Sequence, residues 1–107
     1  MYAKKSPSIN FRLHKQGSNT VLAAADSSTL GIRHEGNGRV LDLVKYASFY
    51  GEETIDAEGL SAHLSGCTSA NLVGEQAVGA AIKLGMATGE QVVKIGGIPH
   101  VQLYRAD

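Results

Sequence analysis

The last third of the chain, residues 69–105, constrains the fold more than any other stretch. Residues 69–84, SANLVGEQAVGAAIKL, carry apolar side chains at helical spacing, and Gly85 follows where a C-terminal cap belongs. Residues 91–95 and 100–104 then alternate like two strands that meet at a Gly-Gly-Ile-Pro corner. The pattern predicts a helix over residues 69–84, followed by a hairpin or a sharply bent pair of strands.

The first half of the chain is typical of strands joined by tight turns. Residues 9–13 alternate between apolar and polar side chains, and residues 20–25 supply the return strand of a hairpin. Asn37-Gly38 is a tight-turn dipeptide in a segment that lacks the Gly-Lys-Ser/Thr ending of a phosphate loop, and residues 40–44 predict another strand. Asp56 can cap a helix with a following apolar stripe.

These elements predict an α+β fold: a small antiparallel or mixed sheet of four to five strands with two helices on one face, in the order strands, helices, strands. Residues 1–8 are polar and contain a proline, so we expect them to form a flexible tail. Residues 9–107 are expected to form a single α+β domain, because a chain of 107 residues is long enough for one core and too short for two.

Composition narrows the class of protein. Ten basic and ten acidic side chains balance at zero net charge, which argues against a dedicated non-specific nucleic-acid binder. The lone Cys67 cannot form an intrachain disulfide and belongs to no CxxC pair, as expected in a reducing compartment. The absence of a long apolar run predicts a cytoplasmic protein that neither spans a membrane nor carries a signal peptide.

Three short blocks resemble a known family. They are Phe-Tyr-Gly at residues 49–51, Asn-Leu-Val-Gly-Glu at residues 71–75, and Ile-Gly-Gly-Ile-Pro-His at residues 95–100, with Gln102 shortly after. Together they are similar to an uncharacterised archaeal family, the one numbered 424 among the domains of unknown function. The resemblance covers about residues 20–104.

Two positions depart from the family pattern: Glu52 stands where a second glycine is expected, and Val101 stands where alanine is frequent. The departure at Glu52 weakens the case for a functional loop at residues 49–53. The resemblance implies an archaeal, cytoplasmic protein without a settled activity. An association with RNA or translation follows only by analogy.

Candidate ligand-binding residues cluster near the end of the chain. In a strand, His100, Gln102 and Tyr104 point to one face, where an imidazole and an amide could read polar edges and the phenol could stack on a planar ligand. An ordinary solvated sheet face is the plainer interpretation. Phe49 and Tyr50 precede a glycine turn and could also stack. The remaining ligand candidates are Asn71, Gly96 and Gly97, and the candidate phosphate contacts are Lys4, Lys5, Arg12 and Lys15.

An enzymatic alternative uses His100 as general acid or base. On the predicted helix Asn71 and Glu75 lie four residues apart, and Glu75 could partner His100 if the last strand packs beside the start of that helix. In the plainer interpretation Asn71 caps the helix and Glu75 is a surface acid. The four histidines show no metal-ligand spacing, and no motif implies a cofactor.

The sequence therefore favours a non-enzymatic binding module associated with RNA or a translation-related ribonucleoprotein. One alternative is a small enzyme that uses His100 and Glu75 on a polar small molecule. Another is a structural oligomer or partner-binding protein that uses the glycine- and alanine-rich face of the predicted helix. Concavity separates the first two, because an enzyme needs these side chains to converge in a pocket, whereas RNA binding tolerates an open face.

Overall fold

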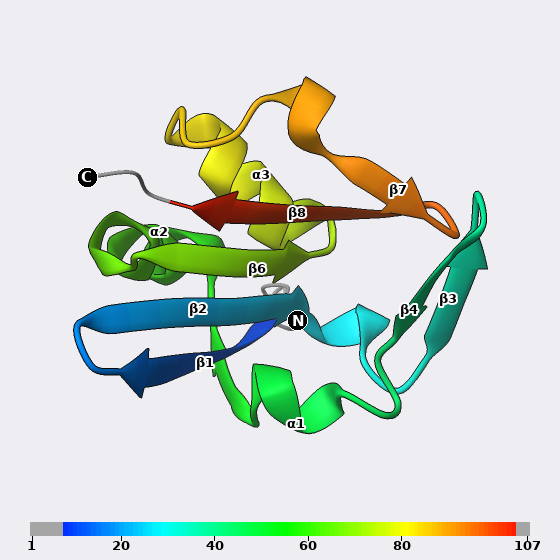
Figure 1. The fold of residues 1–107 in the computed structure, drawn as a ribbon, viewed down its shortest axis with the longest axis horizontal. Coiled ribbons are helices and arrows are strands. Elements are labelled where there is room, and N and C mark those ends of the chain that lie inside the picture. The colour runs from blue at the N-terminus through cyan, green and yellow to red at the C-terminus, as the bar shows by residue number, and fades with distance from the viewer. Residues whose placement is uncertain (1–7, 105–107) are drawn as a thin grey trace, which may run out of the picture.

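The computed structural model describes residues 8–104, which form a mixed α+β fold (Figure 1). The strands are β1 (Ile9–Gln16), β2 (Asn19–Asp26), β3 (Arg33–Gly36), β4 (Arg39–Asp42), β5 (Glu53–Ile55), β6 (Ser69–Val73), β7 (Val93–Ile95) and β8 (Ile98–Tyr104). The α-helices are α1 (Ala47–Tyr50), α2 (Ala57–Gly66) and α3 (Glu75–Lys83), and short 3₁₀ turns occupy Ser27–Thr29 and Gly89–Gln91.

Six strands form one mixed sheet in the order β5-β1-β2-β6-β8-β7, and β3 and β4 form a separate hairpin. Only the central pair, β2 with β6, is parallel within this sheet; the other neighbours are antiparallel. The predicted fold class is confirmed, but the predicted count of four to five strands is too low for the described residues. Two strands of the main sheet were not predicted: β5, which is only three residues long, and β6, which lies in the segment predicted as a helix.

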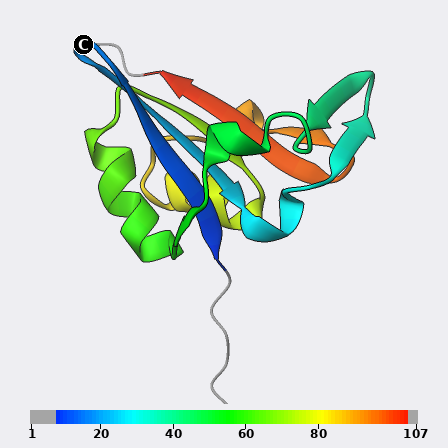
Figure 2. The ribbon, with the colours of Figure 1, turned by 90° about the horizontal axis from the view of Figure 1, so that it is seen from below.

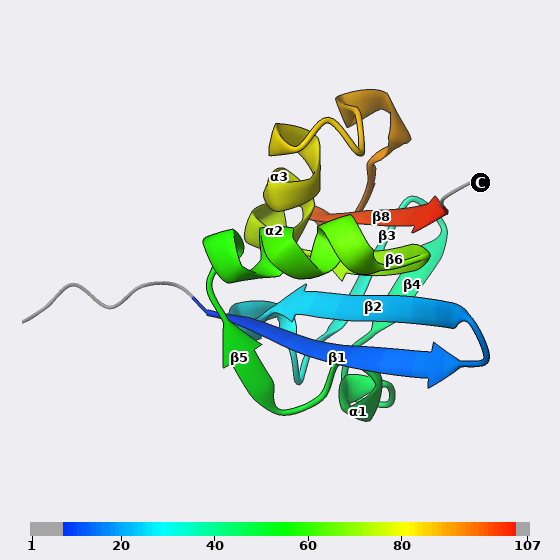
Figure 3. The same cartoon turned by 90° about the vertical axis from the view of Figure 1, so that its left-hand side faces the viewer.

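The main sheet separates two apolar cores. On one face α2 and α3 pack over the sheet, as Figures 2 and 3 show, and bury Leu60, Leu64, Ala77 and Ala81 against Leu22 and Leu72. The other face is covered only in part, by α1 and the β3–β4 hairpin, around a smaller core of Ala23, Ala25, Leu43, Tyr50 and Val73. Two helices on one face were predicted correctly, whereas α1 on the opposite face was not predicted.

The predicted helix over residues 69–84 is wrong in its first third. Ser69–Val73 is the central strand β6, and the helix begins only at Glu75. A strand of five residues shows little alternation, and Leu72 and Val73 also fit the helical spacing that continues through α3, so periodicity does not distinguish it from a helix. Gly74 separates the two elements, because its φ of +100° is incompatible with a helix interior.

The N-terminus of α3 is capped from a distant strand. The carboxylate of Asp26, at the end of β2, accepts hydrogen bonds from the backbone N–H groups of Gln76 and Ala77, both at 2.9 Å. The interpretation of Asn71 as the cap is therefore wrong. A side chain at Gly74 would overlap the Asp26 carboxyl group, so this position requires glycine for space as well as for its φ. Burial, together with the nearby Glu75 carboxylate, raises the pKa of Asp26 although backbone hydrogen bonds lower it.

Other local predictions are confirmed. The β1–β2 hairpin closes at residues 17–18, and Asn37 and Gly38 have φ values of 55° and 73°, as a tight turn requires. Asp56 caps α2 by accepting a hydrogen bond from Gly59 N–H at 2.8 Å. Of the predicted tail, the structure describes only Ser8, whose hydroxyl donates to the Ser27 oxygen at 2.8 Å. No helix within residues 8–104 is long and apolar enough to cross a bilayer.

The strand predicted over residues 40–44 is shifted. It runs from Arg39 to Asp42, because the Asp42 carboxylate accepts hydrogen bonds from Val44 N–H at 3.1 Å and Lys45 N–H at 2.9 Å and turns the chain toward α1. The hairpin then lies beside the β7–β8 turn. At Gly36 a Cβ atom would lie 2.6 Å from the Gly96 nitrogen, so the two backbones touch only because both residues are glycine.

The two glycines of the helical segment predict opposite effects on stability. Gly79 lies inside α3 with open space around it, so we expect Gly79→Ala to raise the free energy of unfolding by about 0.5–1 kcal/mol. Gly74→Ala, the matched control, should lower it by more than this amount, because alanine is strained at positive φ and meets Asp26. Urea unfolding measures both; similar values for the two variants would contradict the assigned role of Gly74.

Candidate functional site

The face opposite the two long helices carries the polar residues of the central strands. In the antiparallel register of β6 and β8, Asn71 lies opposite Gln102 and Val73 lies opposite His100. Ser69 lies opposite Tyr104 in the same way. Directly opposed residues in a sheet point to the same face, so His100, Gln102 and Tyr104 share a face as expected.

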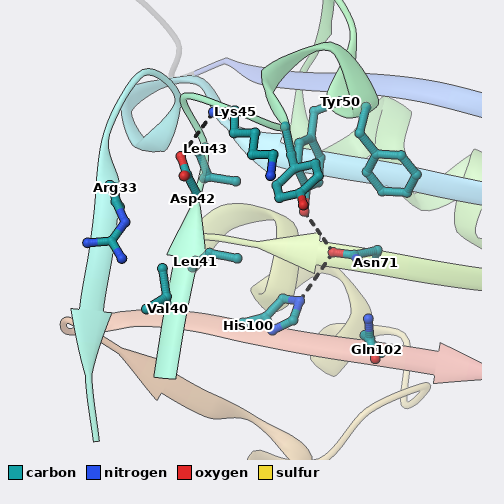
Figure 4. A pocket seen from close by; sticks show the side chains of 12 residues that line it. Arg33, Val40, Leu41, Asp42, Leu43, Lys45, Tyr50, Asn71, His100 and Gln102 are labelled. Carbon is teal, nitrogen blue, oxygen red and sulfur yellow. Dashed lines mark hydrogen bonds between the residues drawn. The ribbon is translucent and has the colours of Figure 1, made fainter. Parts of the chain in front are cut away.

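A cavity of about 640 Å³ opens on this face between the sheet, α1 and the β3–β4 hairpin (Figure 4). The sheet supplies its floor with Asn71, His100 and Gln102. One wall is aromatic and consists of Tyr46, Phe49 and Tyr50. The other wall belongs to the hairpin and the loop that follows it, and consists of Arg33, Val40, Leu41, Asp42, Leu43 and Lys45. Its volume falls within the range of about 300–1,000 Å³ typical of ligand sites.

Three side chains from different elements meet in this cavity. The Tyr50 hydroxyl of α1 donates to Asn71 Oδ1 at 2.9 Å, and His100 Nε2 of β8 lies 3.2 Å from the same oxygen. Figure 4 shows both side chains converging on Asn71 from opposite sides. An amide oxygen only accepts, so His100 Nε2 must carry the hydrogen of this bond. Asn71 Oδ1 therefore accepts two hydrogen bonds.

The protonation states follow from burial. Burial raises the pKa of Tyr50 to about 12, so its hydroxyl keeps the proton that it donates. Burial, and next the positive charge of Arg39, lower the pKa of His100 below its usual value, so the ring is neutral at neutral pH. A neutral ring that donates from Nε2 has an acceptor lone pair on Nδ1. The site thus combines amide donors on Asn71 with an imidazole acceptor on His100.

Positive charge lies along the hairpin side of the cavity. The Lys45 ammonium lies 5.3 Å from the centre of the half-exposed Tyr46 ring, a cation–π arrangement. Arg33 also lines the cavity, where it forms an ion pair with Glu35 across the strand surface. Asp42 is the only carboxylate among the lining residues, and the two backbone N–H groups that it accepts from lower its pKa.

The structure brings five predicted ligand-binding residues into one cavity: Phe49, Tyr50, Asn71, His100 and Gln102. Tyr104 instead lines a second hollow on the same face of the sheet. Lys15 borders that hollow but alternates with His14 in β1, and it also lines a hollow beside α2 on the opposite face. Gly96 and Gly97 form the β7–β8 turn with φ values of 58° and 81°, and Gly96 contacts the β3–β4 hairpin. These glycines therefore position a wall of the cavity rather than line it.

Other predicted contacts are distributed elsewhere. The Arg12 guanidinium donates to the Ser48 carbonyl at 3.1 Å and lines a separate hollow with Glu52 and Glu53, so it joins β1 to α1 beside two acids. Lys4 and Lys5 lie outside the described residues.

Glu75 and His100 are not brought together. Glu75 is an exposed residue at the start of α3, on the face of the sheet covered by the long helices, whereas His100 lies on the other face and contacts Asn71. Within residues 8–104 no group of three or more histidine, cysteine, aspartate or glutamate side chains could hold a metal ion. His63 is half-buried with its ring 5.1 Å from that of Phe11, a packing role.

Sequence reasoning missed the hairpin side of the cavity. Arg33 and Lys45 carry no motif, and they reach the site only because the hairpin packs beside the β7–β8 turn. The one local signal was the glycine content of both turns, which permits this close backbone contact.

The face of α3 that carries alanines does not remain open to a partner. Ala77, Ala80 and Ala81 are buried against the sheet and α2. The alanines of the surface proposed for an oligomer are thus covered within the chain, whereas Gly79 is exposed.

The family model described as "Protein of unknown function (DUF424)" matches residues 14–106. The chain belongs to this family. Its fold is similar to a solved structure described as "Crystal structure of an uncharacterized conserved protein from Methanopyrus kandleri", with a TM-score of 0.71 and 25% sequence identity over 94% of this chain and 96% of that chain. A search of the curated proteins finds no match.

The protonation of His100 gives a test of the site geometry. We expect the His100 ring to titrate below pH 6.5 in the folded protein, because burial and Arg39 disfavour its charged form. NMR titration of the imidazole measures the midpoint, and a value at or above 6.5 would contradict the buried, neutral ring.

The same shift makes stability depend on pH. As pH falls, the unfolded chain takes up this proton before the folded chain does, so the stabilisation is complete above the unfolded pKa of about 6.5 and is lost as pH falls through the folded pKa. The variant His100→Gln should lack this part of the pH dependence of the free energy of unfolding. Equal pH dependence in both proteins would assign the effect to other groups.

Proposed function

We propose that this protein is a non-enzymatic module that binds single-stranded RNA, free or in a translation-related ribonucleoprotein, and takes one nucleotide into the cavity. The observation that carries the proposal is the double occupation of Asn71 Oδ1 by Tyr50 and His100. It fixes the orientation of the amide, so that the Asn71 NH₂ group and His100 Nδ1 remain as donor and acceptor for a ligand. Such a pair suits the polar edge of a nucleobase.

The walls of the cavity support a planar, negatively charged ligand. Tyr46 and Phe49 offer aromatic surface for stacking, and Tyr46 is half exposed. Lys45 stands beside Tyr46, and Arg39 lies close enough to His100 to lower its pKa. A nucleotide combines a flat base with an adjacent phosphate, which matches an aromatic wall with cations at its side.

The surroundings of His100 favour binding over catalysis. Its Nε2 contacts an amide rather than a carboxylate, and the one lining carboxylate, Asp42, is engaged by backbone N–H groups. A general base normally has a partner that stabilises its charged form, and this arrangement instead favours the neutral ring. A neutral imidazole with an acceptor lone pair on Nδ1 still favours one second candidate, an enzyme with His100 as base on a small polar substrate.

The test is fluorescence anisotropy with labelled single-stranded RNA hexamers of mixed sequence, titrated at several salt concentrations. We expect Tyr46→Ala to weaken binding roughly five- to 100-fold, since stacking on one aromatic ring contributes about 1–3 kcal/mol per base. Lys45→Ala should reduce the slope of log affinity against log salt by about 0.7, because one phosphate contact is lost.

Asn71→Asp is the sharpest variant for the base-reading step. It keeps an oxygen for Tyr50 and His100 but replaces the amide donors by a second, negatively charged oxygen, so affinity should fall more than tenfold. Lys83→Ala, on α3 and far from the cavity, is the charge-matched control for Lys45→Ala and should bind like the parent protein. The proposal fails if no single-stranded RNA binds, or if Lys83→Ala weakens binding as much as Lys45→Ala.

The enzyme candidate is tested separately by assaying pools of small polar metabolites for turnover. Turnover that disappears in His100→Gln, without RNA binding by the parent protein, would favour catalysis.

A further inference from the structure

A second hollow lies on the same face of the sheet, next to the cavity. It has a volume of about 540 Å³, and its floor is formed by Val21, Ser69 and Tyr104. Ser69 and Tyr104 are directly opposed in the β6–β8 register, two residues along from the pair formed by Asn71 and Gln102. Because a strand rises about 3.4 Å per residue, the two floors are offset by about 7 Å along the strands.

A pair of stacked rings stands between the two hollows. Phe49 lines the cavity and His14 lines the second hollow. Their ring centroids are 4.6 Å apart with an angle of 15° between the planes, and His14 Nε2 donates to the Phe49 carbonyl oxygen at 2.8 Å. The two hollows thus share an aromatic wall and a continuous floor along β6 and β8.

The second hollow has the chemistry of a nucleotide site. Tyr104 is 79% exposed, the highest value among the large apolar side chains given for the described residues. Gln16 and Asn19 supply amides on this face, whereas Lys15 borders the hollow from a position on the opposite face of β1. None of the residues that line this hollow is acidic. An exposed aromatic ring beside two amides, with no carboxylate to repel phosphate, suits a stacked base.

On the basis of the function proposed above, we infer that the second hollow holds the nucleotide adjacent to the one in the cavity, with Tyr104 stacked on its base and the amides of Gln16 and Asn19 at its polar edge. The offset of about 7 Å is about twice the 3.4 Å rise per nucleotide in a stacked strand. The cavity and the second hollow together therefore accommodate an extended RNA strand with unstacked bases. The ring pair of Phe49 and His14 stands where the two bases would otherwise stack.

The experiment compares labelled RNA of one and two nucleotides, each as a pool of all sequences, on the full chain. In the parent protein the second nucleotide should raise affinity roughly five- to 100-fold, as one stacked base contributes about 1–3 kcal/mol. In Tyr104→Ala this gain should disappear, while the affinity for one nucleotide stays unchanged. Tyr104→Phe keeps the ring and should retain the gain.

The possible outcomes separate this inference from the function on which it rests. If one and two nucleotides bind the parent protein equally, or if Tyr104→Ala preserves the gain, the second subsite is overturned while the cavity remains a nucleotide site. If Tyr104→Ala weakens both probes equally, Tyr104 acts on the cavity or on the fold, and the second subsite is again overturned. If neither probe nor any longer single strand binds the parent protein, the RNA-binding function itself fails.

Discussion

The carboxylate of Asp26 joins the two halves of this fold. It ends β2 and accepts from the first free N–H groups of α3, so one buried side chain ties an N-terminal strand to a C-terminal helix. That link requires the chain to reverse at Gly74, where a Cβ atom would meet the carboxyl group. Because β6 ends just before Gly74 and pairs with β2, its register is fixed. Asn71 therefore faces the cavity, while Leu72 faces the helices.

The cavity depends on a second set of contacts that act on the other face. The backbones of Gly36 and Gly96 touch, which holds the β3–β4 hairpin beside the β7–β8 turn, and Asn37 adds a hydrogen bond to the Lys94 carbonyl at 3.3 Å. On the opposite side the Tyr50 hydroxyl anchors α1 to Asn71. A helix of four residues has little stability of its own, so this tertiary bond and the packing of Phe49 on His14 determine where it sits.

The features that could be predicted from the sequence are those fixed by contacts between residues close together in the chain. The β1–β2 hairpin, the turn at Asn37 and the Asp56 cap are specified within a few residues, and all three were predicted. The split between β6 and α3 was not predicted, because the capping side chain lies 50 residues away from Gln76 and because the alternation in Ser69–Val73 is only five residues long, with apolar positions that also fit a helix. Asn71 and His100 were singled out for their chemistry, but their meeting is a consequence of strand register.

The parallel pairing of β2 with β6 makes the middle of the sheet a seam between two antiparallel sets of strands, β5-β1-β2 and β6-β8-β7. The residues of the cavity come from both sides of this seam. Tyr50 lies on α1, before β6 in the chain, and His100 lies on β8, the last strand of the chain. Neither set of strands contains the complete constellation, so a ligand can recognise only the joined sheet. Any occupant of the cavity must then favour the folded chain over its separated halves, and binding and folding become one linked equilibrium.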